Sequence, residues 1–155
     1  MRKYVTVKNI CISGIVMALY IVLMLLTQSF SFGQYQIRIA TALYALAAPF
    51  PFLIFPLGLA NGLSNLFMST PIDAIGGFAV GILTSVAIYL IRRFKLPDVL
   101  IALPICFVVG LGVPVWLSPM IGVPYWLLAG SLLVGQAVCG VAGVLLIKAV
   151  KRFES

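Results

Sequence analysis

Long apolar runs, separated by short polar or basic segments, make up most of this chain. A membrane-spanning helix needs about 20 mostly apolar residues, and the runs fit six such spans. We place the spans at residues 10–28, 40–55, 56–69, 74–91, 99–116 and 125–147. The second and third runs are short and contain Pro49, Pro51 and Pro56, so we expect tilted or broken helices packed inside a bundle there.

The stretch from Ser29 to Arg38 has a different pattern. Its sequence, SFSFGQYQIR, is polar and aromatic, contains Gly33 and lacks helical periodicity. We expect it to form an outer loop or re-entrant segment after the first helix. The predicted fold is therefore an all-α membrane protein, a six-transmembrane-helix bundle in which residues 1–155 form a single integral membrane domain.

The composition indicates lipid as the solvent of this domain. Hydrophobic residues make up 63% of the chain and charged residues 8%, against about 45–50% and about 25% in soluble domains. A small domain leaves a large fraction of its surface exposed, so it cannot hide this much apolar area from water. We expect little of the chain to lie outside the bilayer.

Charge sets the expected orientation. The chain carries ten basic and three acidic residues, for a net charge of +7, and nine of the basic residues lie at the ends of apolar runs. The three clusters are Arg2, Lys3 and Lys8; Arg92, Arg93 and Lys95; and Lys148, Lys151 and Arg152. Cytoplasmic loops are enriched in Lys and Arg, and six crossings place all three clusters on one side. We therefore expect a multi-pass plasma-membrane protein with both termini cytoplasmic and no nucleic-acid partner.

The sequence offers no catalytic constellation. It contains no His, its one glutamate is Glu154 in the tail, and Asp73 and Asp98 have no local carboxylate partner. No lysine belongs to a Walker A motif, and the three cysteines lie in separate apolar runs without a CxxC pair. We expect a non-enzyme that hydrolyses no ATP itself and needs neither a cofactor nor a metal.

Polar side chains inside a membrane are costly, so their positions are informative. Under the six-span topology they collect toward the outer side, where Asn61, Ser64 and Asn65 share one helix face. The candidate substrate-binding residues are Arg38, Gln36, Gln34, Thr41, Asn61, Asn65, Asp73, Trp116 and Gln136. Three alternatives stay open: interhelical hydrogen bonding for the Asn and Gln residues, an interfacial aromatic belt for Trp116, and snorkelling to the interface for Arg38.

Residues 31–43, SFGQYQIRIATAL, resemble the "fG-x-x-q-x-R-x-S-E-A-L" stretch of the QueT family. Further similarities are PLGLANGLSN at 56–65, PIDAIGG at 71–77 and GQA at 135–137. Members of this family are queuosine-precursor transporters, the substrate-capture (S) components of energy-coupling-factor (ECF) transporters. The chain departs from the family pattern at two acidic positions, which are Thr41 and Gln136 here.

The resemblance implies an ATP-driven importer subunit. Its substrate would be a deazapurine such as preQ0 or preQ1, or a related micronutrient such as a vitamin. Its partners would be a transmembrane coupling subunit and two cytosolic ATPases. Docking onto the coupling subunit would use small residues of the first span, and Gly14 and Ala18 form a small-xxx-small pair there.

Two other functions remain as alternatives. One is a self-contained secondary transporter of a small heterocyclic solute, against which stand the absence of His or Glu within the spans and of an obvious inverted repeat. The other is a structural subunit of a larger membrane complex, which would show no saturable binding of a small molecule. The sequence leaves open which ligand binds, and whether the coupling module is dedicated or shared.

Overall fold

The computed structural model describes residues 6–31 and 37–154, and this part of the chain is helical without any strand. The α-helices are α1 (Val7–Leu26), α2 (Gln28–Ser31), α3 (Ile54–Met68), α4 (Pro71–Arg93), α5 (Ala102–Gly112), α6 (Pro114–Ile121) and α7 (Tyr125–Glu154). The 3₁₀ helices are η1 (Ile39–Ala47), η2 (Pro51–Leu53) and η3 (Asp98–Ile101). The expectation of an all-helical membrane protein is confirmed.

Five helical segments are long and apolar enough to cross a membrane: Val7–Leu26, Pro51–Met68, Pro71–Arg93, Asp98–Ile121 and Tyr125–Phe153. The described residues thus provide one membrane-length helix fewer than the six predicted. The difference lies in the predicted span 40–55. The predicted re-entrant loop falls partly on residues 32–36, which lie outside the described residues; α2 occupies its start.

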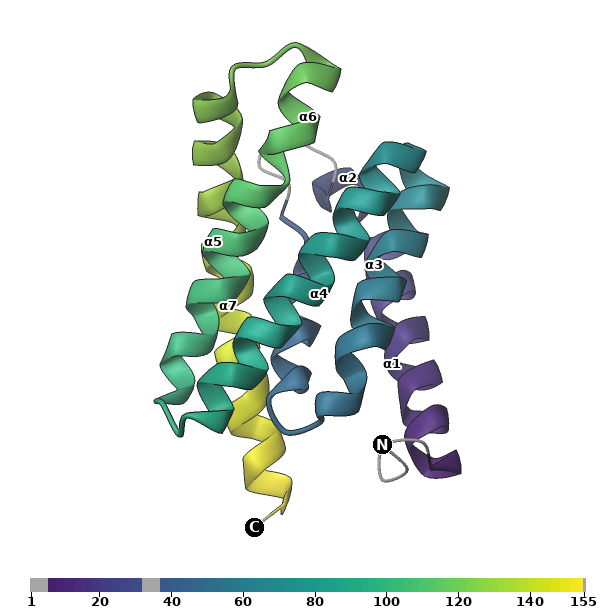
Figure 1. Cartoon of the computed structure of the whole chain (residues 1–155), viewed down its shortest axis with the longest axis vertical. Helices are drawn as coiled ribbons and strands as arrows, with labels where there is room; N and C mark the ends of the chain where they lie inside the picture. Colours follow the sequence, from purple (N-terminus) through teal and green to yellow (C-terminus); the bar gives the residue numbers. More distant parts are fainter. Residues whose placement is uncertain (1–5, 32–36, 155) are drawn as a thin grey trace.

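In place of a second long helix the chain forms η1, whose nine residues are followed by a turn and then by η2. Pro49 and Pro51 explain why no α-helix continues here, because proline lacks a backbone N–H and disfavours helical geometry in the residue before it. A 3₁₀ helix rises about 2.0 Å per residue, so a short stretch covers more height than an α-helix would. Figure 1 shows that residues 37–50 carry the chain from the end of the bundle where α1 ends to the end where α3 begins.

The η1 helix lies at the centre of the bundle. Its residues 40–47 are all buried, and it packs against α1, α3, α4 and α7. Four of its nine residues are alanine, and small side chains allow neighbouring helices to approach closely. The long helices instead turn large apolar side chains outward, such as Leu83 on α4 and Val134 on α7. Polar groups near η1 are therefore screened from lipid by the surrounding helices.

Helices α3 and α4 pack in near backbone contact along a seam of glycines. A Cβ atom at Gly81 would lie 2.9 Å from Cα of Gly58, and one at Gly62 would lie 3.2 Å from the carbonyl oxygen of Ala74. The small-xxx-small pairs on these two helices, Gly58 with Gly62 and Gly77 with Gly81, therefore serve packing within the chain. This close approach allows short side chains on α3 to reach the backbone of α4.

The two ends of the bundle differ in charge. The start of α1, the end of α4 and the end of α7 lie at one end, and the start of α4 and α6 lie at the other (Figure 1). All described basic residues except Arg38 belong to the first end. There Asp98 joins α4 to α7, with its Oδ1 3.8 Å from Nη1 of Arg92 and its Oδ2 2.5 Å from Nζ of Lys151. We call this end the basic end, and the opposite one the polar end.

Candidate functional site

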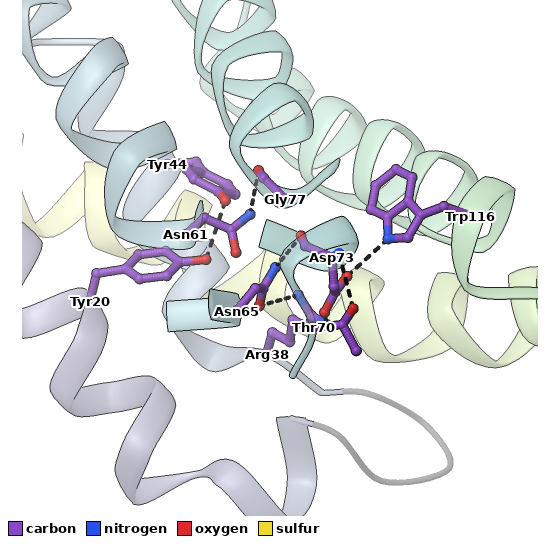
Figure 2. A network of polar contacts seen from close by, with 9 residues as sticks. All are labelled: Tyr20, Arg38, Tyr44, Asn61, Asn65, Thr70, Asp73, Gly77 and Trp116. Carbon is purple, nitrogen blue, oxygen red and sulfur yellow. Dashed lines mark hydrogen bonds and ion pairs between the residues drawn. The ribbon is translucent and has the colours of Figure 1, made fainter. Parts of the chain in front are cut away.

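Arg38 immediately precedes η1, and its side chain points into the bundle. It is 1% exposed. Its Nη1 donates a hydrogen bond to Oδ1 of Asn65 at 3.3 Å, and its Nη2 lies 3.8 Å from Oδ2 of Asp73 (Figure 2). A snorkelling arginine would place its guanidinium in the interface, so this burial argues against a purely interfacial role.

Asp73 lies in the first turn of α4. Thr70 is the N-cap of this helix, and its Oγ1 accepts a hydrogen bond from the backbone N–H of Asp73 at 3.2 Å. A carboxylate is favoured at this position because the N-terminal end of a helix carries partial positive charge. The side chain is 1% exposed; its Oδ1 accepts a hydrogen bond from Nε1 of Trp116 at 2.9 Å, and its Oδ2 has no hydrogen-bond partner among the described residues.

Trp116 reaches this carboxylate because α4 has a glycine beside it. A Cβ atom at Gly76 would lie 2.5 Å from Cε2 of the indole, so any side chain there would displace the ring. The motif GVPxW occurs twice in the chain, at residues 112–116 and 122–126. Trp126 occupies in the second copy the place that Trp116 has in the first, and it is 80% exposed. Trp126 therefore fits the interpretation as part of an interfacial aromatic belt, and Trp116 does not.

Two asparagines on α3 are hydrogen-bonded to the backbone of α4. Nδ2 of Asn61 donates to the carbonyl oxygen of Gly77 at 2.7 Å, and Nδ2 of Asn65 donates to that of Asp73 at 3.1 Å (Figure 2). A Cβ atom at Gly77 would collide with the amide of Asn65. Both amides are thus engaged in holding the two helices together, as the interhelical alternative expects.

A second set of contacts fixes the backbone of Arg38 to α7. Oγ1 of Thr41 lies 2.7 Å from the carbonyl oxygen of Arg38 and 2.9 Å from Oε1 of Gln136. Sγ of Cys139 lies 3.3 Å from the same carbonyl oxygen. Arg38 therefore bridges the bundle, with its backbone held against α7 and its side chain directed toward α3 and α4.

The structure brings together a large part of the predicted site. Arg38, Thr41, Asn61, Asn65, Asp73, Trp116 and Gln136 lie in or beside this network. Gln34 and Gln36 lie outside the described residues. Gly14 and Ala18 are exposed on α1, and a Cβ atom at Gly14 would meet nothing within 4 Å. Within the described residues no group of three or more His, Cys, Asp or Glu side chains could hold a metal ion.

The sequence analysis missed two tyrosines of this network. The hydroxyl groups of Tyr20 on α1 and Tyr44 on η1 lie 3.2 Å apart, and both side chains are fully buried. Figure 2 shows the pair next to Asn61. A buried tyrosine hydroxyl needs a hydrogen-bond partner, but only the fold reveals which one. The cap at Thr70 was detectable, because Thr followed three residues later by an acidic residue is a helix-start signal.

Comparison with known proteins gives one match. A family model described as QueT transporter matches residues 10–152, which confirms the resemblance found in the sequence. No curated protein and no solved structure matches the chain. A transporter family implies a small-molecule substrate and a membrane setting, in agreement with the apolar spans and the buried polar site. Because the match covers nearly the whole sequence, the chain belongs to the QueT transporter family.

Proposed function

We propose that the chain is the substrate-capture (S) subunit of an ATP-driven ECF-type importer. The observation that carries the proposal is the buried Arg38–Asp73 pair at the polar end, opposite the basic end. The positive-inside rule assigns the basic end to the cytoplasm. The polar end then faces the exterior of the plasma membrane, where an importer captures its substrate, and both termini are cytoplasmic.

The proposed substrate is a queuosine precursor, a preQ0- or preQ1-like deazapurine, or a related micronutrient. Family membership supports this choice. The side chains of the network fit it as well, because a guanidinium, a carboxylate and an indole together offer donors, an acceptor and an aromatic surface to a planar heterocycle. Arg38, Asp73 and Trp116 are the side chains that we expect to contact it, supported by Thr41, Asn61, Asn65 and Gln136.

The energy for uptake would come from partner subunits. The sequence contains no Walker A motif, so we assign ATP hydrolysis to two cytosolic ATPases that act through a transmembrane coupling subunit. The exposed position of Gly14 and Ala18 on α1 supports a docking surface there, since small residues let the backbone of a partner helix approach closely.

Reconstitution separates this proposal from its alternatives. We expect the purified chain to bind a deazapurine saturably by itself, and vesicles to accumulate it only when coupling and ATPase subunits and ATP are added. Replacing Gly14 or Ala18 by Leu should abolish uptake and leave binding intact. Uptake by the chain alone, driven by a proton gradient, would identify a secondary transporter, and absence of saturable binding would identify a structural subunit.

A further inference from the structure

The hydrogen-bonding capacity of the network is used unevenly. The Nδ2 donors of Asn61 and Asn65 are committed to α4, and Oδ1 of Asn65 accepts from Arg38. Two buried acceptor atoms of the network accept no hydrogen bond from any described residue: the amide Oδ1 of Asn61 and the carboxylate Oδ2 of Asp73. Only the second belongs to a charged group, and Trp116 occupies the other oxygen of that carboxylate, Oδ1. Nη2 of Arg38 approaches Oδ2 only to 3.8 Å, which is beyond hydrogen-bonding distance.

A buried carboxylate oxygen without a hydrogen bond is unfavourable, because burial removes water that would otherwise bond it. Asp73 is 1% exposed, so bulk water does not readily reach it. A ligand that donates an N–H group to Oδ2 would supply the missing bond. The site therefore favours a ligand with a hydrogen-bond donor at this position over one with an acceptor there.

The charges of the network cancel. Arg38 and Asp73 carry one opposite charge each, and both are 1% exposed. Among the described residues, all other charged ones lie at the basic end, in the ends of α1, α4 and α7, in η3 or in the turn between α4 and η3. A neutral ligand keeps the buried site neutral, whereas a charged ligand leaves an uncompensated charge in a region of low dielectric constant.

We propose that the site selects uncharged ligands and binds them by an N–H donated to Oδ2 of Asp73. This inference rests on the proposed function and deepens it. The site discriminates against a protonated amine near Arg38 and against a phosphorylated ligand near Asp73. Among deazapurines it favours a nitrile substituent, which is neutral, over an aminomethyl substituent, which is protonated at neutral pH.

Two probes of similar shape test the charge rule: 7-cyano-7-deazaguanine and 7-aminomethyl-7-deazaguanine. Their dissociation constants are measured by calorimetry on the purified full chain. We expect the nitrile to bind more tightly by about tenfold or more, equivalent to about 1.4 kcal/mol. Comparable affinities, or tighter binding of the amine, overturn the inference but leave the proposed function standing. If neither probe binds saturably, the proposed function falls, and the inference falls with it.

Single charge changes should move the preference in opposite directions. Arg38→Gln leaves the site negative and should shift the ratio of the two affinities toward the amine. Asp73→Asn leaves it positive and should shift the ratio toward the nitrile. The ratio is insensitive to the fraction of folded protein, so it isolates recognition from stability. A ratio that neither variant changes overturns the charge rule.

The double variant Arg38→Gln/Asp73→Asn controls for folding, because it leaves no unpaired buried charge. It should keep the nitrile preference of the wild type. It should also bind the nitrile about tenfold more weakly or worse, equivalent to about 1.4 kcal/mol, because Asn offers an amide group in place of one carboxylate oxygen. Wild-type affinity in this variant overturns the role of Asp73 as the ligand's acceptor.

Discussion

The chain contains two aspartates that face basic side chains, one at each end of the bundle. At the polar end Asp73 and Arg38 are 1% and 2% exposed in their side chains, and their charged atoms are 3.8 Å apart. At the basic end Asp98 is 21% exposed, and its partners Arg92 and Lys151 are 47% and 37% exposed. The residue types at the two ends are similar, but the solvent around them is not.

This difference in solvent exposure distinguishes the candidate binding site at the polar end from the surface ion pairs at the basic end. Exposed ion pairs contribute about 0–1 kcal/mol because water and salt screen them. A buried pair is expensive to form, and loss of one partner costs about 3–5 kcal/mol because the other charge is left buried. A costly buried pair that leaves one carboxylate oxygen without a hydrogen bond is consistent with a role in binding. The Asp98 pairs instead join helix ends where the chain meets headgroups and water.

Breaking each pair in turn is the strongest test of the comparison. Asp73→Ala should lower the free energy of unfolding by about 3–5 kcal/mol, because it strands the charge of Arg38. The matched variant Asp98→Ala should lower it by about 0–1 kcal/mol. Thermal unfolding of the detergent-solubilised chains measures both. Similar losses in the two variants would contradict the claim that burial separates them.

The two tryptophans of the repeat extend the comparison. Trp116→Phe removes a hydrogen bond to a charged group, so it should cost about 1.5–3 kcal/mol. Trp126→Phe changes a ring that is 80% exposed, so the free energy of unfolding of this variant should stay within about 0.5 kcal/mol of the wild type. The same unfolding measurement applies. If the two variants lose the same free energy of unfolding, the hydrogen bond from Trp116 to Asp73 does not contribute to stability as proposed.

The glycines beside the site provide a third test. Gly77→Ala places a methyl group against the amide of Asn65. We expect this overpacking to lower the free energy of unfolding by about 1–3 kcal/mol. We also expect weaker ligand binding, because the side-chain amides of Asn61 and Asn65 must move. The control is Gly130→Ala on α7, where a Cβ atom meets nothing within 4 Å. Unchanged binding by the Gly77 variant would show that the position of Asn65 is not important for recognition.

Much of this architecture follows from the sequence, because long apolar runs and basic clusters report directly on the cost of placing residues in lipid. The exception is residues 40–55. Apolar composition does not distinguish a 3₁₀ helix from an α-helix, and η1 depends on the neighbouring helices that surround it. The prolines at 49 and 51 indicated a break, but not that residues 37–50 would cross the bundle with only nine residues of helix.

The residues of the candidate site also divide into those that the sequence predicts and those that only the structure reveals. Arg38 and Asp73 stand out in the sequence because charges between apolar runs are rare and costly. Tyr20 and Tyr44 do not, since tyrosine is common in membrane proteins as an interfacial residue. The GVPxW repeat gives Trp116 and Trp126 the same local sequence, but the indole of Trp116 lies against Gly76 of α4, where any side chain would displace it. The local sequence pattern therefore does not determine which of the two tryptophans the tertiary structure turns inward.

Replacing Arg38 by Lys keeps the charge at the polar end and changes only its shape. Lysine offers a compact ammonium in place of a planar fork of five donors, so it cannot reproduce both the bond to Asn65 and the approach to Asp73. We expect ligand binding to weaken by about tenfold or more, equivalent to about 1.4 kcal/mol. We expect the free energy of unfolding to stay near the wild-type value, because the charge of Lys still balances that of Asp73. Wild-type affinity in both Arg38→Lys and Arg38→Ala would place the site elsewhere.

Salt gives the smallest effect and the sharpest contrast between the two ends. The Debye length falls from about 10 Å at 0.1 M salt to about 3 Å at 1 M, so the exposed charges around Asp98 are screened much more strongly at the higher salt concentration. The cost of Asp98→Asn, at most about 1 kcal/mol, should therefore shrink toward zero when unfolding is measured at 1 M salt. Ions do not enter the buried network, so the cost of Asp73→Asn should be the same at both salt concentrations. A salt-dependent cost at Asp73 would mean that water and ions reach the pair. In that case the polar end would be an open vestibule, and the burial that distinguishes it from the basic end would not hold in solution.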